Sequence, residues 1–84
     1  MTRQAATQFL EEVLSEVRQR HPALRTDAIG ELFEVGELRV GLEILCDNLL
    51  EDRLSLSPAA RDKVVEVGQF VGVGSQYWND LAVS

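Results

Sequence analysis

The chain has 84 residues, of which 45% are hydrophobic and 26% are charged, and its formal net charge is −6. This length predicts one domain over residues 1–84, near the lower size limit for a chain that folds without disulfides or metals. The acidic balance and the few aromatic residues argue against direct nucleic-acid binding, which requires a basic surface. No apolar run approaches the roughly 18 residues of a membrane span, so no membrane association is expected.

Two features of the sequence indicate the cellular compartment: the single cysteine, Cys46, and the N-terminal residues. A chain with one cysteine has no disulfide framework, which is typical of a reducing compartment. The first residues carry acids where a secretory signal peptide would have its apolar stretch. We therefore expect a cytoplasmic protein, and we expect the Cys46 thiol to be a small core residue rather than a nucleophile.

The first expected element is a helix over residues 2–20, because apolar residues recur there at three- and four-residue spacing. These residues are Ala6, Phe9, Leu10, Val13, Leu14 and Val17. His21 and Pro22 predict its end, because the residue before a proline is pushed out of helical geometry.

A second, short helix is expected to begin at Thr26 or Asp27 and to stop at Gly36. A third helix should cover residues 37–51. One line of contact is formed there by Leu38, Leu42, Leu45 and Leu49, and the apolar arc is widened by Val40, Ile44, Cys46 and Leu50. An arc this wide predicts a central helix that is contacted from more than one side. Gly41 within it is expected to permit a close helix crossing.

The last long helix is predicted to begin at Ser57 and Pro58, because serine caps a helix and proline suits its first turn. Its apolar face would consist of Val64, Val65, Val67, Phe70 and Val71. Gly72 would end it, and a short turn over residues 76–81 would follow. Trp78 in that turn either anchors the terminal segment to the core, which we favour, or contacts a partner. The elements together predict an all-α fold, a compact bundle of four to five short helices.

The sequence offers no constellation for catalysis or metal binding. The only histidine, His21, precedes a proline and has no partner nearby in the sequence, so we expect it to be a turn residue. Gly68, Gly72 and Gly74 fall late in a predicted helix rather than between a strand and a helix, which does not match a phosphate-binding loop. We therefore expect no enzyme activity, no catalytic residue, no metal site and no cofactor.

The acidic residues gather in the middle of the chain, where residues 26–52 hold eight of the fourteen acids against one base, Arg39. Such a concentration on a small domain predicts a partner with a basic surface. The residues predicted to contact that partner are Glu31, Glu34, Glu37, Glu43, Asp47, Glu51 and Asp52, and the eighth acid is Asp27. The alternative is a solvated face without a partner. For Asp47, a hydrogen bond to the backbone of a neighbouring loop is a further alternative.

Residues 36–81 carry several motifs in a definite order. They are Gly36-Glu37, the run Gly41-Leu42-Glu43-Ile44-Leu45-Cys46-Asp47-Asn48-Leu49, then Glu51, Leu56-Ser57 and Trp78-Asn79-Asp80-Leu81. This order resembles the MafI family of bacterial immunity proteins, from which Gly41 and Leu50 depart. The resemblance implies a cytoplasmic antitoxin that binds and neutralises a cognate toxin, and toxins of this class are often nucleases.

The charge pattern agrees with that implication, because a nuclease site is basic and an acidic helix face could cover it. We therefore expect an immunity protein that binds a cognate toxin with a basic surface. The alternative is a small helical adaptor or regulatory subunit that binds a basic partner protein. The sequence leaves both a monomer and a dimer open.

Overall fold

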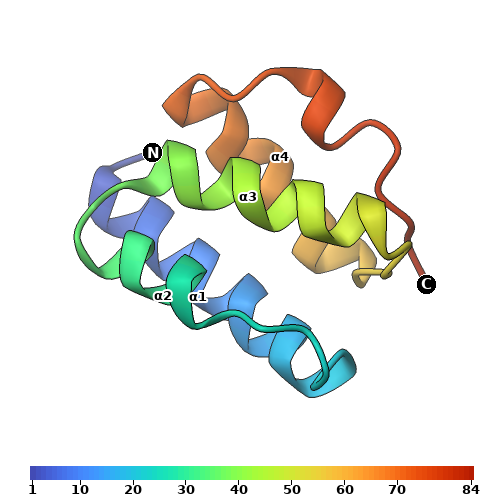
Figure 1. Ribbon diagram of the computed structural model, residues 1–84. Helices are drawn as coiled ribbons and strands as arrows, with labels where there is room; N and C mark the ends of the chain where they lie inside the picture. The colour runs from blue at the N-terminus through green and yellow to red at the C-terminus, as the bar shows by residue number, and fades with distance from the viewer.

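The computed structural model describes residues 1–84 and contains four α-helices, one 3₁₀ turn and no strand (Figure 1). In chain order the elements are α1 (Arg3–Arg20), α2 (Asp27–Glu34), α3 (Leu38–Glu51), α4 (Pro58–Val71) and η1 (Ser75–Tyr77). The predicted all-α bundle is confirmed. None of its helices has the length and apolar character that a membrane-spanning segment requires.

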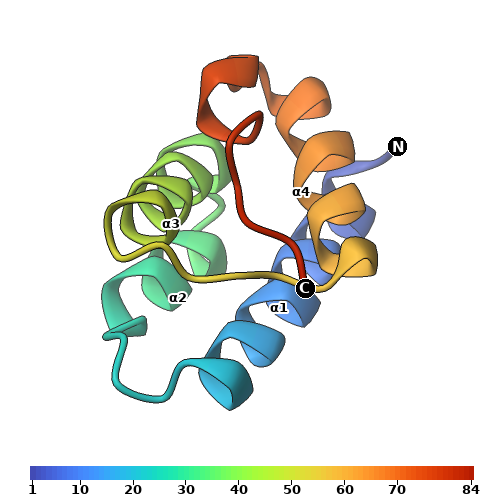
Figure 2. The ribbon, with the colours of Figure 1, turned by 90° about the vertical axis from the view of Figure 1, so that its right-hand side faces the viewer.

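The helices form two pairs, α1 with α4 and α2 with α3, which face each other across the core (Figure 2). After η1 the chain runs down between α3 and α4, where Leu56 and Val83 form an isolated parallel bridge. The core between these elements consists of nineteen buried residues. They are Ala6, Leu10, Val13, Leu14, Val17, Ile29, Phe33, Leu38, Leu42, Leu45, Cys46, Leu49, Leu56, Ala60, Val64, Val67, Val73, Trp78 and Leu81.

Two helices begin with a side-chain cap, at Ser57 as predicted and at Thr2. The Thr2 hydroxyl accepts a hydrogen bond from the Ala5 amide at 3.0 Å, and the Ser57 hydroxyl accepts one from the Ala60 amide at 3.1 Å. The start of α2 differs, because Thr26 makes no side-chain capping bond. Its hydroxyl instead accepts from Arg18 Nε at 2.8 Å, which joins α1 to the beginning of α2.

Three helix ends share one geometry, in which a residue with positive φ follows the last turn. Gly36 and Gly72 end α2 and α4 with φ of 83° each, and Arg53 follows α3 with φ of 54°. In each case the next amide donates to a carbonyl five residues earlier, for example Leu54 to Leu49 at 2.9 Å. Glycine adopts this conformation without penalty, whereas arginine does not.

Replacing Arg53 by glycine is therefore expected to raise the free energy of unfolding by about 0.5–1 kcal/mol, because the left-handed backbone strain disappears. The control is Arg53→Ala, which removes the same charge but keeps the strain and is expected to bring no gain. Urea denaturation of both variants checks the difference. Equal stability of the glycine and alanine variants would show that Arg53 is not strained.

The third helix confirms part of the prediction and corrects part of it. It packs against every other helix and against η1, as a central helix should. Gly41 does permit a close crossing, since a Cβ there would lie 2.6 Å from Cε1 of Phe33 in α2. However, Val40 and Ile44 do not widen the buried arc, because they are 42% and 39% exposed on the outer side of the helix.

The C-terminal part brings two further corrections. Phe70, predicted to belong to the apolar face of α4, is 42% exposed, while Val64 and Val67 of that face are fully buried. The predicted turn over residues 76–81 begins one residue earlier, as the 3₁₀ helix Ser75–Tyr77, and turn geometry continues to Asp80. After Asp80 the chain extends toward Leu56, whose amide donates to the Ala82 carbonyl at 3.0 Å.

Candidate protein-binding surface

The carboxylates of α2 lie on the side of that helix opposite its buried residues. Ile29 and Phe33 face the core, whereas Asp27, Glu31 and Glu34 are exposed and follow one another at four- and three-residue spacing. This spacing places the three carboxylates in one row along the helix. Phe33 sets the orientation of the row, because its ring is packed against Gly41 of α3.

The outer face of α3 carries a second row, made of Val40, Ile44, Asp47 and Glu51. All four side chains are exposed, and their spacing of four, three and four residues keeps them on one side of the helix. The row lies opposite the buried leucines of the same helix. We call these four residues the α3 outer row.

Glu43 stands apart from this row. Its carboxylate lies 3.5 Å from Nε of Arg39, and only 24% of its side chain is exposed. The three ion pairs of the molecule are Arg20–Glu16, Arg39–Glu43 and Lys63–Glu12. Of the eight acids in residues 26–52, Glu43 is therefore the only one with a paired charge. The other seven carboxylates are unpaired, so this part of the chain carries uncompensated negative charge.

The remaining predicted contact residues lie around the edges of the α2–α3 hairpin. Glu34 lines a cavity of about 290 Å³ between α1 and α2, together with Glu11 and Arg18. Asp52 lies at the far end of α3, in a hollow that also contains Leu24. Glu37 precedes α3 and its side chain makes no capping hydrogen bond. The structure thus brings Asp47 and Glu51 together in one row. Glu31 and Glu34 lie on α2, Glu37 and Asp52 lie at the two ends of α3, and Glu43 is paired with Arg39.

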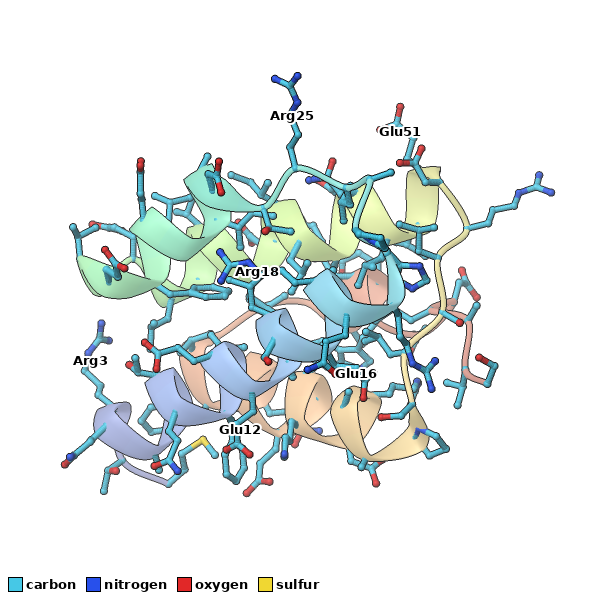
Figure 3. The ribbon with its side chains drawn as sticks, turned by 90° about the horizontal axis from the view of Figure 1, so that it is seen from below. Arg3, Glu12, Glu16, Arg18, Arg25 and Glu51 are labelled. Atoms are coloured by element: carbon cyan, nitrogen blue, oxygen red, sulfur yellow. The ribbon has the colours of Figure 1, made fainter.

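Two arginines of α1 make structural contacts with the α2–α3 hairpin. Arg3 donates to the carbonyl of Gly36, and Arg18 donates to Thr26. Figure 3 shows Arg25 projecting outward from the side of the molecule formed by α2 and α3, the same side as Glu51, whereas Glu16 lies on α1 toward α4. Arg25 is thus a positive charge on the same side as Glu51, in addition to Arg39 on α3 and Arg53 directly after it.

The side chain of Asp47 makes no hydrogen bond, so the alternative in which it binds a neighbouring loop is wrong. Its carboxylate is left exposed on the outer side of α3. The neighbouring thiol of Cys46 is fully buried, and burial, aided by the negative charges of Asp47 and Glu43, raises its pKa to about 12. Cys46 is therefore a core residue, because a thiol needs its thiolate form to act as a nucleophile.

The other candidate residues also have structural contacts. His21 ends α1, and its Nε2 lies 2.7 Å from the carbonyl oxygen of Ser55, so the ring joins α1 to the connector before α4. Trp78 is 6% exposed, and its ring covers Gly68 of α4. The interpretation of Trp78 as an anchor of the terminal segment is confirmed. The chain contains no group of three or more His, Cys, Asp and Glu side chains placed to hold a metal ion.

Sequence reasoning missed Val40 and Ile44 as surface residues, although a signal was present. Both precede Asp47 by a helical spacing, seven and three residues, so all three must lie on one side of α3. A carboxylate without a partner cannot face the core at low cost. The exposure of Asp47 therefore implies the exposure of Val40 and Ile44.

The fold and this surface define a small all-α domain whose exposed carboxylates concentrate on one helical hairpin. No protein-family model matches the chain, and no curated protein or solved structure matches it either.

Proposed function

We propose that the chain is an immunity protein, which binds and neutralises a cognate toxin through the α2–α3 hairpin. The observation that carries the proposal is the pair of unpaired carboxylates Asp47 and Glu51, which share one face of α3 with the exposed Val40 and Ile44 on a hairpin rich in unpaired acids. Protein interfaces commonly combine an apolar centre with a polar rim. The resemblance of residues 36–81 to the MafI family supports a toxin as the partner, and a nuclease with a basic site would complement the charge.

Neutralisation by such a protein needs no chemistry of its own. An acidic surface that covers a basic site prevents phosphates from entering, because both compete for the same positive charges. Complementary charge also raises the association rate, which matters when free toxin is lethal. An adaptor or regulatory subunit with a basic partner could use the same surface. The two functions are distinguished by the partner, which is toxic to the cell only if this chain is an immunity protein.

The test of the proposal is expression of the reading frame next to this gene, with and without this chain, followed by counting of surviving cells. Killing that this chain prevents would support immunity. A neighbouring product that is harmless alone, and that binds this chain, would favour the adaptor. The toxin obtained in this way then serves for measurements of association.

Charge reversal on the α3 outer row is expected to slow association with the toxin. Asp47→Lys with Glu51→Lys replaces two unpaired carboxylates, and the rate constant should fall by about tenfold or more at low ionic strength. The matched control is Asp62→Lys with Glu66→Lys on α4, which has the same residue types at the same spacing. Stopped-flow mixing at several salt concentrations measures both. If the two double variants slow association equally, only the net charge matters and α3 is not the contact.

A further inference from the structure

The α3 outer row contains two apolar side chains that the fold does not use. Val40 and Ile44 stand four residues apart, with 42% and 39% of their surfaces exposed. Helix propensity does not account for them either, because alanine, lysine or glutamate would suit a solvated helix position better than a β-branched residue. Val35, which is 74% exposed, lies in the turn that leads into this end of α3.

The other end of the row is acidic. Asp47 and Glu51 continue it for about two more turns, so that the row measures about 16 Å along the helix axis. Neither carboxylate takes part in an ion pair. One exposed helix face thus presents an apolar half and a negative half, in a fixed order from the N-terminal to the C-terminal end of α3.

We infer that the α3 outer row binds a basic amphipathic helix of the partner. Apolar side chains of that helix would cover Val40 and Ile44, and its lysines or arginines would meet Asp47 and Glu51. The inference rests on the proposed function, because it names the part of the partner that this chain contacts. A helix fits because a row of side chains four apart packs into the groove between the corresponding rows of another helix.

The negative charge of the α3 outer row disfavours a second copy of this chain as the molecule that binds there. Two copies packed through the same row would place four carboxylates, Asp47 and Glu51 of each copy, in one interface. The only base on α3 is Arg39. Like charges brought together at an interface cost free energy and disfavour the contact. A cationic helix relieves this repulsion and covers the apolar half at the same time.

The experiment uses a synthetic, end-capped peptide of about 16 residues, built from leucine, lysine and alanine, with leucines on one helical face and lysines beside them. Amide chemical shifts of the isotope-labelled protein report where the peptide binds. We expect the largest changes at Val40, Ile44, Asp47 and Glu51. The double variant Val40→Ser with Ile44→Ser should bind about tenfold more weakly or worse, because the apolar contact is lost.

The matched protein control is Phe70→Ser on α4, which removes an apolar side chain of the same exposure, 42%, and should leave binding unchanged. The matched peptide control is an isomer with its leucines scattered, which keeps the charge and should bind far more weakly. The inference is overturned if the peptide binds elsewhere, if both peptides bind alike, or if no binding occurs at millimolar concentration. It is also overturned if sedimentation shows self-association through α3. A harmless neighbouring gene product would contradict the proposed function without changing this peptide result.

Discussion

Trp78→Ala is expected to lower the free energy of unfolding by about 3–5 kcal/mol, the usual cost of deleting a large buried aromatic ring. The ring is 6% exposed and lies directly on Gly68, so its removal opens a cavity between η1 and α4. The C-terminal segment after Trp78, whose Val83 forms the bridge with Leu56, would lose the side chain that fixes it to the core. Far-UV circular dichroism during urea denaturation measures the loss, because the variant has no tryptophan fluorescence.

The matched control is Phe70→Ala, which removes an aromatic ring that is 42% exposed on the same helix that Trp78 covers. Its effect should be smaller, about 1–2 kcal/mol, because a large part of the ring already contacts solvent in the folded protein. A loss for Trp78→Ala no larger than that of Phe70→Ala would contradict the anchoring role.

Gly68 supplies a second test of the same contact. A Cβ at Gly68 would lie 2.1 Å from Cζ3 of Trp78, so Gly68→Ala should be destabilising by about 1–3 kcal/mol through overpacking. In the Trp78→Ala background the clash is absent, and alanine favours a helix over glycine by up to about 1 kcal/mol. The sign of the Gly68→Ala effect should therefore reverse, which a double-mutant cycle detects.

The second large effect is expected at Glu16, which joins α1 to the start of α4. Its carboxylate accepts from the Ser57 amide at 2.8 Å and from the Ser57 hydroxyl at 2.6 Å, and its side chain is only 25% exposed. Hydrogen bonds to a charged group contribute more than neutral ones, so Glu16→Ala should cost about 2–3 kcal/mol at neutral pH. The control is Glu12→Ala on the same helix, which breaks only the exposed pair with Lys63 and should cost less than about 1 kcal/mol.

The contribution of Glu16 should depend on pH. Burial raises the pKa of Glu16, but the two hydrogen bonds from Ser57 and the charges of Arg20 and Lys63 lower it, and the result lies below the ordinary value of 4.5. A depressed pKa in the folded protein means that the stabilisation is complete above the pKa of the unfolded chain. It is lost as the pH falls through the lower pKa of the folded state.

The difference in stability between the wild type and Glu16→Gln should accordingly be largest near neutral pH and shrink below about pH 4.5. Urea denaturation over this range checks the trend. A difference that stays constant down to strong acid would mean that the Glu16 charge is not what holds Ser57.

Most of the helix boundaries could be predicted from the sequence, because they depend on neighbours within four residues. Thr2 and Ser57 cap their helices by hydrogen bonds to amides three residues on, and Gly72 adopts the left-handed conformation that ends α4. The end of α1 at His21 follows from the proline after it. The buried leucines of α3 were likewise evident, since their spacing matches the turn of a helix.

The side of α3 that faces solvent is the feature of this helix that the prediction assigns incorrectly. Apolar residues occupy most of the circumference of α3, and the prediction that Val40 and Ile44 widen its buried arc is wrong. Their helical spacing from the exposed Asp47 is the signal in the sequence that indicates the correct side. The positions of α2 and of the C-terminal segment decide which flanks of α3 are covered. The same holds for Phe70, whose exposure depends on where η1 packs.

The amino-acid sequence by itself determined the helical class, the order and ends of the helices, and the concentration of acid between residues 26 and 52. These properties follow from local hydrogen bonding, side-chain spacing and composition. The spacing of residues in α3 also places Asp47 and Glu51 in one row with Val40 and Ile44. The tertiary structure alone decided that Glu16 reaches Ser57 and that Trp78 lies on Gly68. Both contacts join different elements of the fold, and such packing leaves no signature in the spacing of residues along one helix.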